Sequence, residues 1–387
     1  MAATTSPHPQ RERTMHLNRI PRNSTALPRY TLAAIGFLST LAFSTACIAQ
    51  TPDANFPSWL DGRFEWRVSQ TLLSTNDGKL PDSSEHPWIA IKDPSVVQHD
   101  GRWHLFCSLR KKIDGNGRIR IGYLSFTQWD EANEATWQLL NLTEEYHGAP
   151  QVFYFAPQQT WYLIYQAVDS TRGLKYGPCY STNKDITEPQ DWTLPKPLYE
   201  VKAGNKAGLD FWVICDDQFA FLFFTSLDGT MWRAQTELAN FPDKGWTDPE
   251  VALRADIFEA SHTYRVGNTG RYLTFVEAQR GRRRFFKAYL ADNLAGVWAP
   301  LADSDKMPFV SPANVLNQST SWAQSYSHGE LLRESNDQHL SIAPDQMKMV
   351  FQGASDSEYG VGSYGDIPWR LGLLELADEP NSTTTLP

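Results

Sequence analysis

The stretch KDPSVVQHDGRWHLFCSL, residues 92–109, followed by RIRIGYLSF, residues 118–126, contains a pattern from which the fold can be inferred. Its runs are short, rich in β-branched and aromatic residues and bounded by polar residues or glycine, which is typical of β-strands. Asp100 and Gly101 separate the first two runs, and an Asp-Gly pair favours a two-residue hairpin turn. The segment therefore predicts three consecutive antiparallel strands.

The same unit recurs four more times along the chain. The first strands of the five copies begin near Asp93, Pro150, Asp210, Glu259 and His328. Steps of roughly 50 to 70 residues, with several strands in each, are typical of propeller blades. We therefore predict an all-β protein in which residues 64–378 form a five-bladed β-propeller and a single domain.

The composition limits the classes of partner. Of the 387 residues, 35 are Lys or Arg and 44 are Asp or Glu, which gives a net charge of −9. Such a chain has no broad basic surface for nucleic acid or an anionic membrane, so we expect neither as a partner. The chain contains 14 Trp, which suit strand packing and also stacking on the apolar faces of sugar rings.

Residues 1–49 have the layout of an export signal. Several arginines precede the apolar run YTLAAIGFLSTLAFSTACIA, residues 30–49, which ends in small residues. We expect cleavage after Ala49 and a secreted or periplasmic protein. Cleavage before Cys47 would instead leave a lipid anchor, although Ser44 stands where such a signal usually has Leu.

Outside the propeller the mature chain is short and polar. We expect a linker over residues 50–63 and a disordered tail over residues 379–387, and no later segment is long and apolar enough to span a membrane. Cys107, Cys179 and Cys215 lie in apolar or strand-like stretches. Three cysteines cannot all pair, so we predict free, buried thiols.

Three carboxylates stand at the start of predicted inner strands. Asp93, Asp210 and Glu259 open the first, third and fourth of them, and inner strands of a propeller converge on one axis. Each acid alone could be a solvated strand end, but acids gathered in a cleft raise one another's pKa. Glycoside hydrolysis uses one carboxylic acid to protonate the leaving oxygen and one carboxylate to activate water. Lys92 would keep Asp93 ionised, whereas the apolar residues before Glu259 would favour its protonated form.

The motifs around these acids resemble those of glycoside hydrolase family 62, the α-L-arabinofuranosidases that act on arabinoxylan. The resemblance covers roughly residues 64–378 and rests on six stretches: WIAIKDPSVV, QVFYFAPQQTWYLIYQ, LDFWVI, IFEASHTY, SHGELLR and YGDIPWRLGLLEL. It implies an inverting enzyme that releases single L-arabinofuranose units. It also implies that Asp93 is the general base, that Glu259 is the general acid, and that Asp210 orients the sugar and modulates the pKa of Glu259. Family 43, which includes β-xylosidases and arabinanases, is the near alternative, and a non-catalytic carbohydrate-binding propeller is the alternative from another class.

Further residues are candidates for binding. The resemblance places Lys92 and Tyr364 at sugar-contacting positions, and it places His328 beside a cation on the axis, usually taken as calcium. Gln279 is a third candidate sugar contact, with ordinary hydrogen bonding within its strand as the alternative. Trp88 could form an aromatic wall for the leaving chain or pack in the core. We expect no organic cofactor and a monomer.

Three local features need a separate interpretation. Ala167 stands where the family tends to carry an aromatic residue, which leaves the shape of the sugar pocket open. GVGSYG, residues 360–365, matches a dinucleotide-binding pattern, but no strand precedes it and Pro368 prevents a following helix, so we interpret it as a loop. RGRRR, residues 280–284, is interpreted as a solvated hairpin turn, with a grip on acidic polysaccharide as the alternative.

Overall fold

A computed structural model describes residues 58–76, 79–81, 87–200, 208–360 and 362–377. The predicted export signal, Cys47 and the predicted tail lie outside these residues, as does most of the predicted linker. The part of the linker segment that is described forms a 3-10 turn, η1 (Ser58–Asp61), in which Trp59 is 2% exposed. These linker residues therefore pack as part of the folded domain.

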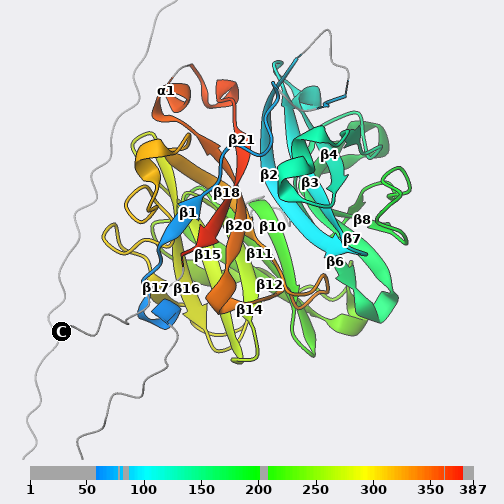
Figure 1. The fold of residues 1–387 in the computed structure, drawn as a ribbon. Helices are drawn as coiled ribbons and strands as arrows, with labels where there is room; N and C mark the ends of the chain where they lie inside the picture. The colour runs from blue at the N-terminus through cyan, green and yellow to red at the C-terminus, as the bar shows by residue number, and fades with distance from the viewer. Residues whose placement is uncertain (1–57, 77–78, 82–86, 201–207, 361, 378–387) are drawn as a thin grey trace, which may run out of the picture. The chain divides into compact units, whose positions relative to one another are not determined.

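Five antiparallel sheets follow one another along the chain, and they form a five-bladed β-propeller, as predicted (Figure 1). Blade 1 contains β2 (Trp88–His99), β3 (Arg102–Lys111), β4 (Ile119–Phe126) and β5 (Gln138–Leu139). Blade 2 contains β6 (His147–Phe155), β7 (Thr160–Asp169), β8 (Leu174–Asn183) and β9 (Lys196–Pro197). Blade 3 contains β10 (Leu209–Cys215), β11 (Phe219–Ser226), β12 (Thr230–Glu237) and β13 (Glu250–Arg254).

The last two blades complete the ring. Blade 4 contains β14 (Glu259–Val266), β15 (Arg271–Arg280), β16 (Arg283–Ala291) and β17 (Ala299–Ala302), with the short β19 (Ser341–Ile342) beside β14. Blade 5 contains β18 (Ser325–Leu331), β20 (Lys348–Ala354), β21 (Arg370–Leu376) and, as its outermost strand, β1 (Trp66–Val68). Because β1 precedes blade 1 in the chain but pairs with β21, it ties the two ends of the described chain together. The sequence pattern revealed the three inner strands of each blade but missed β1 and the short outer strands.

The helical segments are short. The one α-helix of the described residues is α1 (Asp356–Tyr359). The 3-10 turns besides η1 are η2 (Asn116–Arg118), η3 (Trp129–Glu134), η4 (Ala156–Gln158), η5 (Ser170–Arg172), η6 (Leu238–Asn240), η7 (Gln318–Thr320), η8 (Pro344–Gln346) and η9 (Tyr364–Asp366). No helix of the described residues is long and apolar enough to cross a membrane.

Each inner strand carries a β-bulge at one equivalent position. One residue at the bulge has a positive φ, although none of them is glycine: Asp93 (51°), Ala149 (51°), Asp210 (55°), Ala260 (52°) and His328 (27°). The pairing of every inner strand with its neighbour shifts register at this point. A bulge leaves one residue out of the ladder and re-aims its side chain, so five such residues face the axis with N–H groups free to bond elsewhere.

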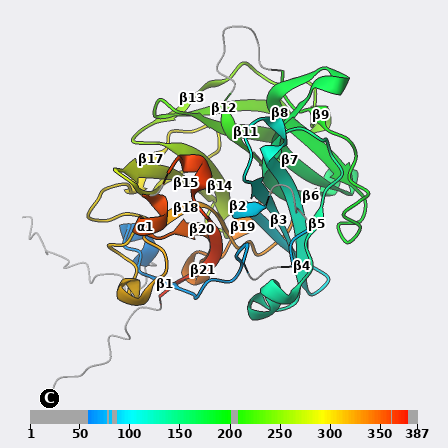
Figure 2. The same ribbon diagram turned by 90° about the horizontal axis from the view of Figure 1, so that it is seen from above.

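These free N–H groups join each blade to the one before it. The bonds run from Asp93 to Gln352 Oε1 (2.8 Å), from Ala149 to Ser108 Oγ (2.8 Å), from Asp210 to Gln166 Oε1 (3.1 Å), from Ala260 to Asp210 Oδ2 (3.1 Å) and from His328 to Glu277 Oε2 (2.8 Å). Four of the five acceptors lie on the second strand of the preceding blade. The bond from Asp93 in blade 1 reaches Gln352 in blade 5. These five bonds form a first tier and close the ring of blades that Figure 2 shows from above.

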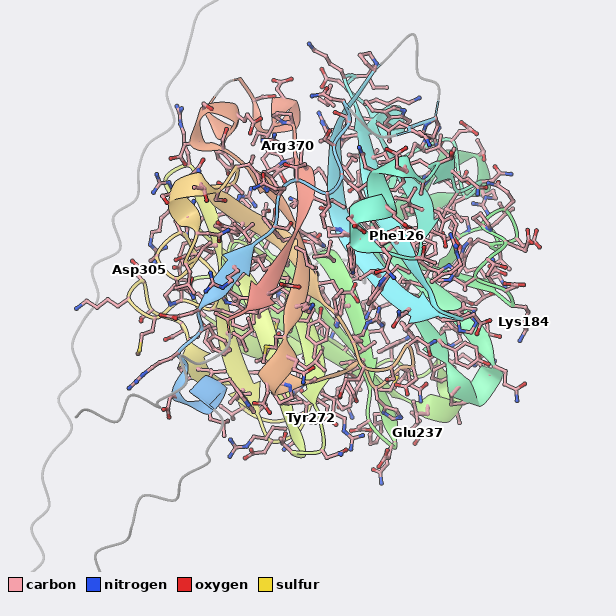
Figure 3. All side chains as sticks on the ribbon, viewed as in Figure 1. Phe126, Lys184, Glu237, Tyr272, Asp305 and Arg370 are labelled. Carbon is pink, nitrogen blue, oxygen red and sulfur yellow. The ribbon has the colours of Figure 1, made fainter. Side chains whose placement is uncertain are left out.

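A second tier of side-chain bonds joins the inner strands further along. It pairs Ser95 with Val152 N–H, Gln151 with the backbone of Val213, Trp212 with Thr263 O, Tyr264 with Leu331 N–H, and Glu330 with Val96 N–H. Aromatic side chains are prominent in the largest buried cluster. Figure 3 shows all described side chains on the ribbon. The predicted Asp100-Gly101 turn is confirmed, because both residues have positive φ. The three cysteines are free and buried, as predicted.

The left-handed bulge predicts an unusual response to glycine. A residue with a Cβ pays about 1–2 kcal/mol in this conformation, whereas glycine does not. Ala149→Gly should therefore be less destabilising than Ala220→Gly, by about 1 kcal/mol. Ala220 is also a buried alanine, but it lies in the regular strand β11, so both variants lose one buried methyl group. Denaturant unfolding of the two variants measures the difference, and equal losses would contradict the strained bulge.

Candidate active site

The predicted acids converge, but their positions are not all equivalent. Asp93 and Asp210 are bulge residues, whereas Glu259 stands one residue before the bulge of its strand. Glu259 pairs with Glu277 as Lys92 pairs with Ser108, so its structural counterpart in blade 1 is Lys92. The prediction that all three acids occupy one equivalent strand-start position is therefore wrong for Glu259. Asp93 also lies inside β2 rather than at its beginning.

One imidazole nitrogen lies close to two of the acids. His328 Nδ1 is 3.5 Å from Asp93 Oδ1 and 3.9 Å from Asp210 Oδ1. Asp210 Oδ2 in turn accepts a hydrogen bond from the N–H of Ala260, the residue after Glu259. The bulges of blades 1, 3 and 5 and the start of β14 thus place the three carboxyl groups around one end of the axis.

Asp93 lies in a setting that favours its ionised form. Its side chain is 11% exposed, and Lys92 Nζ lies 3.6 Å from Oδ1. Burial alone would raise the pKa of Asp93, but the charge of Lys92, together with His328 and a hydrogen bond from Ser108, outweighs it, and the pKa is lowered. Burial would likewise lower the pKa of Lys92, yet Asp93 and Tyr364 reverse that effect, so the ammonium group stays charged.

Glu259 lies in a setting that favours its protonated form. Burial raises its pKa and the nearby Glu277 raises it further, while Arg284 and Lys92 oppose the shift. Arg284 Nη1 lies 2.6 Å from Glu259 Oε1 and fixes the carboxyl group in place. The Arg284 guanidinium also lies 3.9 Å from the ring centroid of Phe258, which covers it from the apolar side.

The pKa of Asp210 is raised, as that of Glu259 is. Burial raises the pKa of Asp210 well above its ordinary value, and the charges of Glu259 and Asp93 add to the shift. Two buried carboxyl groups this close cannot both ionise cheaply. The site is therefore divided into one ionised carboxylate, Asp93, and a pair of acids that retains a proton.

The imidazole ring of His328 does not add a positive charge beside the three acids. Burial lowers the pKa of His328 against the opposing effect of Asp93, which favours the neutral ring at neutral pH. Calcium prefers six to eight oxygen ligands. The described residues contain no group of three or more His, Cys, Asp or Glu side chains placed to hold a metal ion. A calcium ion beside His328 would therefore need most of its ligands from water.

Lys92 and Tyr364 lie beside the acids. Lys92 Nζ is 5.2 Å from the centroid of the Tyr364 ring, and the Arg284 guanidinium is 5.1 Å from the same centroid. Tyr364 is 45% exposed, so its ring presents an open surface at the mouth of the site. An exposed ring beside buried acids is suited to contact a sugar.

Comparison with known proteins shows the family of this chain. The model of glycosyl hydrolase family 62 matches residues 74–375. The chain belongs to this family. The chain is 36% identical to α-L-arabinofuranosidase C of Cellvibrio japonicus over 312 residues. The match covers 79% of the chain but only 47% of that relative. The chain thus spans about half the length of the curated relative that it matches.

Solved structures place the family 62 chain among similar domains. The catalytic domain of the family 62 α-L-arabinofuranosidase of Coprinopsis cinerea superimposes with a TM-score of 0.73 at 38% identity, covering 82% of this chain and 98% of that one. The α-L-arabinofuranosidase of Podospora anserina in complex with cellotriose gives 0.72 at 32% identity, covering 83% and 99%. A family 43 protein from a capybara gut metagenome, at 16% identity and a TM-score of 0.51 over 81% and 53%, shares the fold alone.

Two residues of this family 62 chain that were predicted to contact the sugar substrate, Gln279 and Trp88, make hydrogen bonds within the protein. Gln279 accepts from the Tyr359 hydroxyl (3.3 Å) and donates to Gly281 O (3.2 Å), so its amide is used on both sides. Trp88 is 9% exposed and packs in the core of blade 1, with its Nε1–H bonded to Pro81 O. Ala167 is fully buried between blades 1 and 2, so the departure at this position lies in the core rather than on an open wall.

The arginine-rich run forms an exposed hairpin turn, as predicted, with Arg284 as the exception. Arg283 and Arg282 bind the helix α1 through Asp356 (2.5 Å) and through Gly360 O at its C-terminal end (3.1 Å). We call α1 and the 3-10 turn η9 the rim helices. Arg284 is 2% exposed and reaches Glu259, so it is part of the site and not of a solvated turn. Spacing within a basic run gives no sign of this contact.

Other residues around the site were missed because nothing in the sequence sets them apart. Arg370, labelled in Figure 3, binds Glu358 of α1 (2.6 Å), and Arg110 donates to Gly365 O of η9 (2.6 Å). Tyr146 accepts from Gln166, and its pKa is raised to about 12, chiefly by burial. Tyr176, 39% exposed, lies near it with ring centroids 6.1 Å apart.

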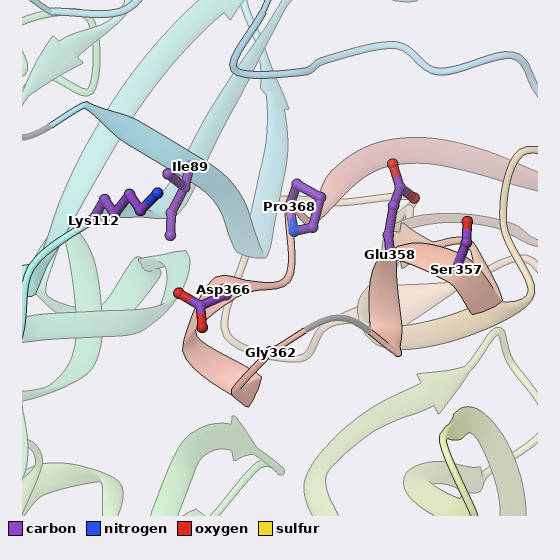
Figure 4. A pocket seen from close by; sticks show the side chains of 7 residues that line it. All are labelled: Ile89, Lys112, Ser357, Glu358, Gly362, Asp366 and Pro368. Atoms are coloured by element: carbon purple, nitrogen blue, oxygen red, sulfur yellow. The ribbon is translucent and has the colours of Figure 1, made fainter.

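A hollow of about 700 Å³ lies between the start of β2 and the rim helices (Figure 4). It is lined by Ile89, Lys112, Ser357, Glu358, Gly362, Asp366 and Pro368. Its walls combine apolar surface with charged and hydroxyl groups, which suits a hydroxyl-rich ligand. Since Tyr364 and Asp366 belong to the same 3-10 turn, the hollow borders the mouth of the site.

The raised pKa of Asp210 predicts that this acid costs stability. Below about pH 3.8 it is protonated in both states, but as the pH rises the unfolded chain ionises while the folded site resists. Asp210→Asn keeps an oxygen for the Ala260 N–H and removes this cost. We expect it to raise the unfolding free energy at pH 7.5 by about 1 kcal/mol or more, with the gain vanishing near pH 4. Denaturant unfolding at both pH values measures it, and a loss of stability at pH 7.5 would contradict the assignment.

Proposed function

We propose that this chain is a secreted α-L-arabinofuranosidase that removes single L-arabinofuranose side chains from arabinoxylan or a related hemicellulose with inversion. The observation that carries the proposal is the difference between the carboxyl groups: Lys92 lies beside Asp93, whose pKa is lowered, whereas burial raises the pKa of Glu259. The names of the similar proteins support the sugar. Secretion rests on the signal-like residues 1–49 alone.

In the proposed mechanism each proton has a donor and an acceptor. Asp93 takes a proton from a water molecule while the water oxygen bonds to the anomeric carbon of the arabinose. As the bond to the leaving oxygen breaks, Glu259 gives that oxygen its proton, so the polymer leaves as a neutral alcohol. Arg284 fixes the carboxyl group of Glu259 for this transfer. Exchange with solvent then restores both carboxyl groups.

Asp210, Lys92 and Tyr364 are proposed to bind the sugar and tune the acid. Asp210 is proposed to modulate the pKa of Glu259, because the charge of either carboxylate disfavours ionisation of the other, and to bind a sugar hydroxyl. Lys92 donates to a second hydroxyl and keeps Asp93 ionised, and the exposed ring of Tyr364 packs on the sugar.

The main chain of the polymer is proposed to lie across the mouth of the site. Similar family 62 structures are complexes with cellotriose and with xylotriose, which are short β-1,4-linked chains. Lys112 and Asp366 line the hollow beside the rim helices, where they could form hydrogen bonds with the hydroxyl groups of such a chain.

A calcium ion beside His328 also remains a proposal. Such an ion would take one nitrogen from His328 and most of its other ligands from water, and no step of the mechanism depends on it. Calcium added to protein treated with a chelator should raise the melting temperature if the ion binds the folded state. An unchanged melting temperature up to millimolar calcium would contradict the proposal.

Removing either catalytic carboxyl group should stop turnover. Asp93→Asn and Glu259→Gln should each lower kcat on arabinoxylan by at least about 100-fold, the usual effect of a lost acid or base. On an aryl arabinofuranoside with a very good leaving group, Glu259→Gln should recover much of its activity, since that oxygen needs no proton. Arabinose release is the measurement. Near-full activity of either variant on the polymer would overturn its assigned role.

The stereochemistry of the product tests the inverting mechanism. Proton NMR of the first turnovers should show β-L-arabinofuranose before mutarotation, because water attacks the face opposite the leaving chain. In a crystal structure the carboxyl groups of Asp93 and Glu259 should then lie roughly 6.5 to 9.5 Å apart, with room for that water. An α-anomer as first product, or a spacing near 5 Å, would indicate a retaining enzyme.

A further inference from the structure

A buried ion pair lies directly behind Glu259. Glu277, on the second strand of blade 4, is fully buried and binds the same Arg284 Nη1 that reaches Glu259. The other carboxylate oxygen of Glu277 accepts from Ser327 Oγ (2.7 Å) and from His328 N–H (2.8 Å). Arg284 Nε donates to the Tyr359 hydroxyl (3.0 Å), so the guanidinium is held on two sides.

Equivalent positions in the other blades carry neutral side chains. The second-strand side chains that accept the bulge N–H groups are Ser108 in blade 1, Gln166 in blade 2 and Gln352 in blade 5. A hydroxyl or an amide thus satisfies this structural bond, and a carboxylate is not needed for it. Burying an ion is costly unless it has a partner of opposite charge. The negative charge of Glu277 therefore calls for a reason other than the joining of blades.

Arg284 provides that reason. A cation at 2.6 Å from Glu259 orients the carboxyl group, but on its own it would also favour the ionised form and spoil a general acid. A carboxylate bound to the same Nη1, as Glu277 is, offsets that charge. The Glu277–Arg284 pair can then hold Glu259 in one geometry without taking away its proton.

We propose that Glu277 is a positioning residue for the general acid, which anchors Arg284 against Glu259 and cancels the charge of the guanidinium at that carboxyl group. The proposal rests on the proposed function, because it needs Glu259 to act as an acid. Glu277 touches no reacting atom and acts only through Arg284.

The other charged and titratable groups around Glu259 come from several elements. They are Lys92 on β2, Asp210 on β10, Arg284 on β16 and Tyr364 on η9, together with Tyr176 on β8. Replacing Glu277 leaves all of these side chains in the protein, although the same lost charge also lowers the pKa of Asp210. A change in the titration of Glu259 in that variant can therefore be traced to the charge at residue 277.

Glu277→Gln is the direct test. It keeps an oxygen for the His328 N–H but removes the charge, so Arg284 acts on Glu259 unopposed and lowers the pKa of Glu259. The alkaline limb of kcat/KM on arabinoxylan should move to lower pH by about one unit, an activity loss of about tenfold on that limb. With an aryl arabinofuranoside that has a very good leaving group, activity should stay within about threefold of wild type.

Glu330→Gln is the matched control. Glu330 is also a fully buried carboxylate, it pairs with Arg333 at 2.6 Å and it accepts a backbone N–H of the neighbouring blade, but it does not contact Arg284 or Glu259 in the described structure. It should lower stability and leave the alkaline limb in place. If Glu277→Gln moves the limb no further than Glu330→Gln does, the positioning role is overturned while the proposed function stands. If the wild type releases no arabinose, both fail.

A double variant covers the case in which Glu277→Gln does not fold. Glu277→Gln with Arg284→Gln removes both charges and leaves no unpaired buried ion. Its alkaline limb should lie within about half a unit of wild type, while kcat on arabinoxylan falls by at least about tenfold because Glu259 is no longer held. A double variant with wild-type kcat would overturn the proposal.

Discussion

The left-handed bulge on every inner strand is the feature on which the rest of the site depends. It turns one N–H group per blade out of its own sheet, and that group bonds to a side chain of the preceding blade. The bond joins the blades, and the bulge at the same time points its own side chain toward the axis. Because Asp93, Asp210 and His328 are bulge residues, the joint that closes the ring also places the chemistry.

The electrostatics of the site follow from which neighbour each acid meets on this ring. Asp93 has Lys92 beside it in its own strand, and a buried carboxylate with a cation next to it stays ionised. Asp210 meets the backbone of blade 4 and the charges of Glu259 and Asp93, so its pKa rises. Glu259 meets Arg284, whose charge is shared with Glu277. Acids with similar burial thus reach different protonation states.

Much of this arrangement could be predicted from the sequence. Strand runs and turn residues repeat with each blade, so the repeat alone predicts the five inner strands and the convergence of the acids on the axis. The one-residue offset of Glu259 was not, because a bulge changes which residue faces the axis and leaves no mark in composition. Arg284 was hidden in a basic run, and its burial depends on contacts with β14 and β15 that only the folded sheet creates. For Trp88 the sequence left an aromatic wall and core packing open, and the structure shows core packing.

The central claim is that the neighbours of the three acids set different protonation states, and a carboxyl-carbon NMR titration tests it most directly. The protein would carry ¹³C-labelled aspartate and glutamate side chains, with signals assigned through single amide variants of each acid. The account predicts that Asp93 stays ionised to below its ordinary pKa of 3.8, while Glu259 and Asp210 give up their protons above their ordinary values. If Asp93 instead retains its proton to a higher pH than Glu259, the account is contradicted.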